Sequence, residues 1–301
     1  MANATLIHSP GGGSASEQDL ARARELLSAQ LELEVVLVSD DISPPEHARR
    51  ALARGSRLLI ASGGDGTVSG VGGMLVGVPD AVLGILPRGT ANSIATHLGV
   101  PRDVDAACAV ILGGHTRVID TGVVNGRPML LMATIGVHAE AITDVDPERK
   151  RMLGALAYVL EEVDRMIDSE LFEVTVEANA QRATSMANAV TVANIARVAT
   201  VLAQGSASIE PDDGKLGVTL VAIQGLAEAI ATTFHLATSA LMARPAERDN
   251  IGHFRTAEVR IETKEPKRVM VDGEDAEQTP ITVTCLPRSL SVLVPKLSDP
   301  D

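Results

Sequence analysis

Aromatic residues are almost absent from this chain, whose 301 residues include one Tyr, three Phe and no Trp. Proteins that bind single-stranded nucleic acid stack its bases on aromatic rings, and this sequence offers no such platform. Basic residues are also in the minority, with 26 Lys and Arg against 39 Asp and Glu and a net charge of −13. This acidity argues against a nucleic-acid partner and against electrostatic adhesion to anionic membranes.

Cysteines and long hydrophobic runs are scarce as well. Cys108 and Cys285 stand far apart and outside any metal-ligand spacing, which predicts buried free thiols in a reducing compartment. The chain opens without the basic and apolar pattern of a signal peptide. The most membrane-like stretch, Leu220 to Met242, contains a Gln, a Glu and a His, which favours a buried or amphipathic helix over a span. We therefore expect a cytoplasmic protein, at most peripheral to the inner face of the membrane.

Glycine is plentiful, and one cluster of it follows a short apolar run. Leu58 to Ala61 is typical of a buried strand in a parallel sheet, and Gly-Gly-Asp-Gly-Thr follows from Gly63 to Thr67. Glycines let backbone N–H groups approach a polyanion, while Asp65 is suited to hold a metal ion or accept a proton. The helix predicted over Val68 to Val76 directs its N-terminus to the same spot, which favours phosphate. A tight turn without a ligand is the alternative for this motif taken alone.

A second segment repeats the design. Val82 to Leu86 is another apolar strand, and Pro-Arg-Gly-Thr-Ala-Asn-Ser follows it from Pro87 to Ser93. We expect the two loops side by side at the carboxyl ends of neighbouring strands, where open α/β sheets bind ligands.

Strands and helices alternate over the first part of the chain, which predicts a parallel sheet with helices on both faces. Further strands of this sheet are expected at Thr5 to His8 and Val35 to Val38. From the Asn125-Gly126 hairpin signal onward strands dominate, which predicts a second, mostly antiparallel domain. Its strands are expected at Met129 to Ile135, Leu171 to Val176, Ala189 to Ile195, Leu216 to Ile223, Val259 to Glu262, Arg268 to Val271, Ile281 to Thr284 and Ser291 to Val294, with helices around Arg149 to Ile167 and Leu226 to Met242.

The two glycine loops resemble those of the diacylglycerol kinase catalytic-domain family, in particular the soluble bacterial lipid kinases. Three further family motifs have counterparts in order along the chain: Ser9 to Gly13, Asp212 to Leu216, and Asp272-Gly273-Glu274. The resemblance implies a nucleotide-binding α/β domain over residues 1–122 and a β-sandwich-like, lipid-acceptor domain over residues 123–289. It also implies that residues 290–301 return to the first domain.

The resemblance implies an ATP- and Mg²⁺-dependent kinase that phosphorylates a diacylglycerol-like lipid in a cleft between the two domains. Asp65 would organise metal and phosphate, and Glu274, with Asp272 beside it, would act on the acceptor hydroxyl. The reverse division between Asp65 and Glu274 is the alternative. The metal ligands would be Asp65, Asp213 and Asp120, although simple turn roles suit the last two as well. The nucleotide-binding residues would be Ser9, Gly63, Gly64, Gly66, Thr67, Gly89, Thr90 and Asn92.

The chain departs from the family pattern at three positions. Ser9 replaces an asparagine, Ser93 replaces the acid that follows the asparagine of Gly-Thr-x-Asn, and His138 replaces the acid of Gly-Phe-Asp-Ala. Ser93 removes one carboxylate from the expected metal network. His138 contacts the acceptor or is a partly buried structural histidine.

Two other functions stay open. NAD kinases share the first glycine loop, but the second loop and the Asp-Gly-Glu motif disfavour that assignment. A non-catalytic nucleotide- or lipid-binding module is the other alternative, and Ser93 supports it. The expected partners are ATP, the lipid and a transient, apolar contact with the membrane surface. A homodimer is also left open, and no nucleic acid is expected.

Overall fold

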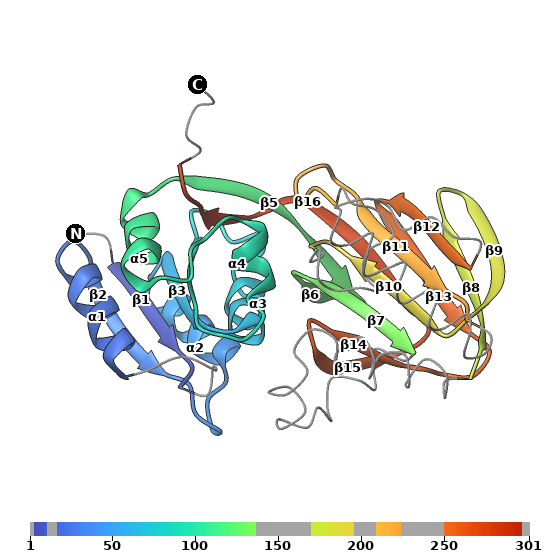
Figure 1. The fold of residues 1–301 in the computed structure, drawn as a ribbon, viewed down its shortest axis with the longest axis horizontal. Helices are drawn as coiled ribbons and strands as arrows, with labels where there is room; N and C mark the ends of the chain where they lie inside the picture. The colour runs from blue at the N-terminus through green and yellow to red at the C-terminus, as the bar shows by residue number, and fades with distance from the viewer. Residues whose placement is uncertain (1–2, 11–16, 137–169, 196–208, 224–249, 297–301) are drawn as a thin grey trace, which may run out of the picture. The chain divides into compact units, whose positions relative to one another are not determined.

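The computed structural model describes residues 3–10, 17–136, 170–195, 209–223 and 250–296 (Figure 1). The chain divides into two units, Met1–Thr121 with Leu286–Asp301 and Gly122–Cys285. Both helices expected after residue 136, the glycines of the first turn and His138 lie outside the described residues. Within the described ranges, no helix is long and apolar enough to cross a membrane.

The first unit is built on a parallel sheet. Its strands pair in the order β2, β1, β3, β4, and the last part of β16 joins β4 in parallel. β2 and β3 lie on opposite sides of β1. The direction in which the chain adds strands to the sheet therefore reverses at β1. Open sheets bind ligands at such a point. The strands are β1 (Asn3–His8), β2 (Glu32–Leu37), β3 (Leu58–Gly63), β4 (Val82–Pro87) and β16 (Ile281–Leu293).

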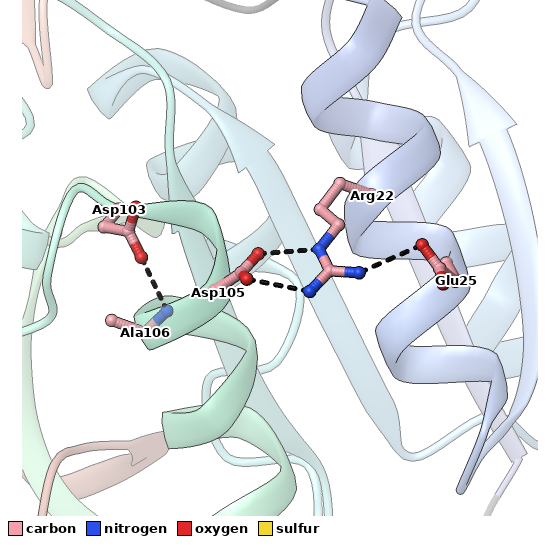
Figure 2. Close-up of polar contacts among 5 residues, drawn as sticks. All are labelled: Arg22, Glu25, Asp103, Asp105 and Ala106. Atoms are coloured by element: carbon pink, nitrogen blue, oxygen red, sulfur yellow. Dashed lines mark hydrogen bonds and ion pairs between the residues drawn. The ribbon is translucent and has the colours of Figure 1, made fainter.

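Helices cover both faces of this sheet, as the alternating pattern predicts. They are α1 (Glu17–Ser28), α2 (Pro44–Ala53), α3 (Asp65–Gly73), α4 (Ser93–His97) and α5 (Val104–Gly113). α1 packs against α5 and α2 packs against α3, and right-handed crossovers place these pairs on opposite faces. Local sequence sets several helix ends: Pro44 opens α2, and Asp103 caps α5 by accepting the Ala106 N–H at 2.9 Å (Figure 2).

An exposed ion pair joins α1 to α5 (Figure 2). Arg22 donates to both carboxylate oxygens of Asp105, at 2.9 and 2.8 Å, and to Glu25 of its own helix at 3.1 Å. The hydrogen bonds from Arg22 lower the pKa of Asp105, and the same contacts raise the pKa of Arg22. Because the residues are exposed, the pair is expected to add little to stability.

The second unit is a sandwich of two mostly antiparallel sheets. One contains β16, β13, β8 and β9, with the β5–β6 hairpin attached to β16, and the other has the order β12, β11, β10, β7, β14, β15. The strands are β5 (Thr116–Val124), β6 (Arg127–Met129), β7 (Met132–Gly136), β8 (Phe172–Ala178), β9 (Gln181–Ala187), β10 (Ala189–Ala193), β11 (Leu216–Val221), β12 (Ile251–Thr256), β13 (Glu258–Thr263), β14 (Arg268–Val271) and β15 (Glu274–Gln278).

Most of the core of the sandwich is valine and isoleucine, with Phe172 in the same buried cluster. Val174 and Val259 come from one sheet and Val190, Val218 and Val269 from the other, and all five belong to one buried cluster. Branched side chains of this kind suit a pleated surface. The predicted fold class, an α/β domain followed by a mostly antiparallel sandwich, is confirmed.

Three details of secondary structure differ from the sequence prediction. The strand expected over Met129 to Ile135 is broken at Leu130 and Leu131, because the Asp272 carboxylate takes up their N–H groups. β9, β12 and β15 are not predicted from the sequence, because few of their side chains are buried and their sequences show no alternation of apolar and polar residues. The two strands expected after residue 280 are one strand, β16.

Candidate active site

The two glycine loops lie side by side at the carboxyl ends of β3 and β4, as predicted. These strands pair in parallel as far as Gly63 and Pro87, and the Arg88 N–H donates to the Gly63 carbonyl at 2.8 Å. A Cβ atom on Gly89 would lie only 2.5 Å from the Cα of Gly64. Packing of one loop on the other therefore requires glycine at position 89, whereas a Cβ atom on Gly64 would make a tight contact of 3.2 Å with the Cα of Gly89.

Gly63 and Gly66 differ in their surroundings. A Cβ atom on Gly63 would clash with the Thr67 side chain, which is buried against the end of the strand. Gly66 is exposed, and apart from the backbone of its own helix no atom of the described residues lies within 4 Å of the position that its Cβ would take. Packing thus explains the glycine at 63 but leaves the one at 66 without a structural reason. A close approach by a ligand would supply that reason.

The N-terminus of α3 is open at this position. Among the described residues no side chain caps the helix, and Val68 is the first to bond within it, donating to the Gly64 carbonyl at 3.0 Å. The earlier N–H groups lack helical partners and carry the positive end of the helix dipole. A phosphate group fits both properties.

Asp65 links the two loops. It is the first residue of α3, and its Oδ1 accepts the Ile94 N–H near the start of α4 at 3.2 Å. The residue before α4, Asn92, contributes no side-chain cap to that helix. One oxygen of Asp65 therefore caps α4, and the other is available to a cation or a proton at the partly exposed loop edge.

Asn92 shapes the second loop. Its Oδ1 accepts the Gly89 N–H at 2.8 Å, and its Nδ2 donates to the Gly89 carbonyl at 2.7 Å. Asn92 is buried and has a φ of 54°, a left-handed conformation that Asn adopts more readily than most residues. Thr90 is exposed, and its carbonyl accepts a hydrogen bond from Arg102 at 2.8 Å. The structure thus gives Asn92 a supporting part and leaves Thr90 at the surface of the loop.

The end of β1 brings two more residues to the same edge. The Ser9 N–H donates to the Ser62 carbonyl at 2.9 Å, and the buried His8 places its Nδ1 2.9 Å from the Ser62 Oγ. Burial and the positive charge of Arg88 lower the pKa of His8. Arg88 lies within the second loop motif and His8 directly precedes Ser9, but neither is named as a site residue from the sequence. Their position at the ends of β1 and β4 is the signal that points to them.

We expect His8 to make the protein less stable in acid. The pKa of His8 in the folded protein lies below the usual 6.5. Its contribution to the free energy of unfolding is therefore complete above pH 6.5 and is lost as the pH falls below that value. His253 of the second unit, whose pKa is lowered by burial and by Arg255, acts in the same direction. Melting temperatures of wild type and His8→Asn from about pH 7.5 to about pH 5.5 test this. The variant should show the smaller decrease, and equal decreases would show that His8 does not titrate there.

The predicted acids Asp120 and Asp213 have partners inside their own units. Asp120 is buried and accepts the Arg288 N–H at 2.7 Å. Asp213 forms an ion pair with Arg255, with contacts of 2.5 and 2.8 Å, and accepts the Lys215 N–H at 3.1 Å. Metal binding by Asp213 would therefore displace Arg255. Among the residues that the structure describes, no three His, Cys, Asp or Glu side chains form a metal-binding group, and the Mg²⁺ ligands remain a prediction.

Asp272 and Glu274 follow β14 and differ in their partners. The Asp272 carboxylate accepts three backbone N–H groups, from Leu130 at 2.8 Å, Leu131 at 2.8 Å and Met132 at 3.0 Å. The Glu274 side chain is 66% exposed and meets Arg127 at 2.6 Å. An exposed pair of this kind is weak, so Glu274 can exchange its partner for a substrate group. Asp272 instead holds residues 130–132 in place.

Two family models match successive parts of the chain. The diacylglycerol kinase catalytic domain matches residues 3–124, and the YegS C-terminal NAD kinase beta sandwich-like domain matches residues 132–294. The chain is also 31% identical over 253 residues to the diacylglycerol kinase of Bacillus subtilis, covering 83% of this chain and 81% of that one. The chain belongs to the diacylglycerol kinase family.

Three further proteins are similar to this chain over most of its length. An uncharacterised protein of Synechocystis is 36% identical over 304 residues, covering 96% of this chain and 70% of the relative. A crystal structure of a diacylglycerol kinase from Bacillus anthracis covers 97% of both chains, with a TM-score of 0.76 and 24% identity. That structure supports the fold alone. A crystal structure of yeast NADH kinase covers 99% of this chain and 85% of its own, with a TM-score of 0.59 and 12% identity, and this likeness too concerns the fold alone.

Proposed function

We propose that the protein is a kinase that transfers the terminal phosphoryl group of ATP, with Mg²⁺, to a hydroxyl of a diacylglycerol-like lipid. The observation that carries this proposal is the pair of glycine loops locked together at the open N-terminus of α3, with Asp65 between them. Phosphoryl transfer depends on positioning and on stabilisation of charge, and this arrangement offers backbone N–H groups and a carboxylate in one place. Membership of the diacylglycerol kinase family supports the reaction class.

Each residue has a defined part in this proposal. The N–H groups of Gly66 and Thr67 and the exposed loop at Thr90 bind the phosphates, and the residues that keep the loops in shape are Ser9, Gly63, Gly64, Gly89 and Asn92. Asp65 holds Mg²⁺, whose preference for oxygen ligands its carboxylate fits, and the ion when bound neutralises phosphate charge. Asp120 and Asp213 complete the metal network by exchanging their present partners.

Glu274 accepts the proton of the acceptor hydroxyl in this proposal. As the hydroxyl oxygen forms its bond to the γ-phosphorus, the bond to the bridging oxygen of ATP breaks and ADP leaves with the electron pair. Asp272 acts as the support of the neighbouring chain. With a net charge of −13, the protein reaches its lipid through a transient apolar contact with the membrane surface.

Labelled ATP offered with detergent-dispersed lipids and, separately, with NAD tests the proposed function. We expect the label in the lipid product when diacylglycerol and Mg²⁺ are present, and no transfer when a chelator removes the metal. Label on NAD would make the protein an NAD kinase. Binding of ATP without any labelled product would make it a non-catalytic binding module.

Ser93 provides a separate test of the metal network. It is buried, opens α4 and precedes Ile94, whose N–H bonds to Asp65. Ser93→Asp adds a carboxylate beside Asp65, and we expect the Mg²⁺ concentration for half-maximal activity to fall on the order of fivefold. Ser93→Asn is the matched control, because it adds similar volume without charge. Superimposed Mg²⁺ titrations of wild type and Ser93→Asp would exclude position 93 from the metal site.

A further inference from the structure

The side chain of Arg88 has no role in the proposed reaction, although it is buried and bonds both to α1 and to the residue at position 102 that follows the second loop. Its Nη1 donates to Asp19 of α1 at 2.8 Å, and its Nη2 donates to the Arg102 carbonyl at 3.3 Å. Arg102 in turn donates to the carbonyls of Thr90 and Ala91, at 2.8 and 3.1 Å. These bonds form a chain from α1 to the second glycine loop.

The second loop depends on support of this kind. The regular structure between Gly89 and Arg102 is α4, whose five residues are too few to be stable by themselves. The Arg88 side chain binds the backbone at position 102, and the Arg102 side chain binds the backbone at positions 90 and 91. The two arginines therefore hold both ends of the segment to each other.

Asp19 ties this support to α1. It lies in the first turn of α1, the helix that follows the turn after β1. The Arg88 side chain is 9% exposed and the Asp19 side chain 33% exposed. A buried guanidinium that loses its carboxylate is left as an uncompensated charge, which is the costly way to break an ion pair. The position of α1 and that of the second loop are therefore coupled.

We propose that the Asp19–Arg88 ion pair is a positioning device that holds residues 90–92 in their nucleotide-binding conformation. The identity of the ligand rests on the proposed function. Arg88 acts through Arg102 and the loop backbone, so its loss weakens nucleotide binding and leaves the chemical step at saturating ATP unchanged. A raised KM with constant kcat is the kinetic form of such a change.

The experiment compares full-length wild type, Arg88→Met, Arg88→Lys and Asp19→Asn. We expect Arg88→Met and Asp19→Asn to raise the dissociation constant of ATP about tenfold, with kcat within about twofold of wild type. Arg88→Lys keeps the charge but lacks the planar guanidinium group. Its dissociation constant for ATP should lie between those of these variants and that of wild type. Amide hydrogens of residues 89–92 should exchange faster in the variants, measured on the free proteins.

The exposed ion pair between α1 and α5 supplies a matched control. Arg22→Gln removes this contact of the same helix (Figure 2) without touching the second loop, and both ATP affinity and exchange at residues 89–92 should stay as in wild type. An equal effect of Arg22→Gln would show that the orientation of α1 alone matters and would overturn the proposal.

Three further outcomes decide the matter. If Arg88→Met keeps wild-type exchange and wild-type ATP affinity, the proposal is wrong. If kcat falls while affinity is unchanged, Arg88 acts on the reaction itself and the positioning role is wrong. If wild type binds no ATP, the proposed function fails, and exchange at residues 89–92 alone decides whether the pair holds the loop. Should Arg88→Met not fold, Asp19→Asn answers each of these by the same measurements.

Discussion

Replacing Asp65 with asparagine is expected to lower kcat on the order of 10³-fold while the fold stays intact. The amide has nearly the shape of the carboxylate, and its oxygen can still accept the Ile94 N–H that supports α4. It cannot carry the negative charge that a divalent metal or a transferred proton requires. Asp65→Asn therefore keeps the hydrogen bond from Ile94 and removes only the negative charge that the reaction requires.

The measurements are turnover with labelled ATP and the thermal melting temperature. Asp65→Ala should lose both activity and the bond to Ile94, with a decrease in stability of about 1 kcal/mol. Asp103→Asn is the matched control, since Asp103 also accepts a first-turn N–H, that of Ala106 in α5, at a point outside the glycine loops. Its activity should equal that of wild type. Wild-type turnover in Asp65→Asn would refute the assignment of the site.

The substitution Gly66→Ala is expected to weaken ATP binding at least about tenfold without destabilising the protein. Apart from the backbone of its own helix, no atom of the described residues lies within 4 Å of the new methyl group, so the free protein is expected to accommodate it. A helical alanine is moreover favoured over glycine by up to about 1 kcal/mol. The methyl group would instead occupy the space through which a phosphate reaches the N–H groups of α3.

Gly89→Ala is the contrasting variant. Its Cβ atom would lie 2.5 Å from the Cα of Gly64, so the loops must separate. We expect a loss of about 1–3 kcal/mol of stability together with the loss of binding. Calorimetric titration with ATP and thermal melting of both variants distinguish the two cases. Unchanged affinity in Gly66→Ala would mean that phosphate does not approach this turn of α3.

The sequence by itself determined the local elements and their order. The apolar runs at Leu58 and Val82, the glycines that end them and the Asn125-Gly126 turn each act through residues adjacent in the chain. Alternation of strand and helix patterns was then sufficient for the fold of the first domain, since it specifies parallel strands with crossover helices, whereas the sandwich of the second domain is expected from the family resemblance. β9 and β15 are not predicted, because exposed polar strands owe their pairing to a neighbour and carry no periodic signal of their own.

The tertiary structure alone showed which groups each motif residue contacts. Gly64 meets Gly89, Asp65 bonds to Ile94, and these contacts join segments that the sequence presents as separate motifs. By local pattern Asp272 and Glu274 are two similar acids, yet three backbone N–H groups hold the first, and the second is exposed and paired with Arg127. Whether a carboxylate supports the fold or remains available for chemistry depends on the donors that distant segments bring to it. Most of those donors are backbone N–H groups, which do not depend on the side chain. The sequence therefore contains no residue pattern that predicts them.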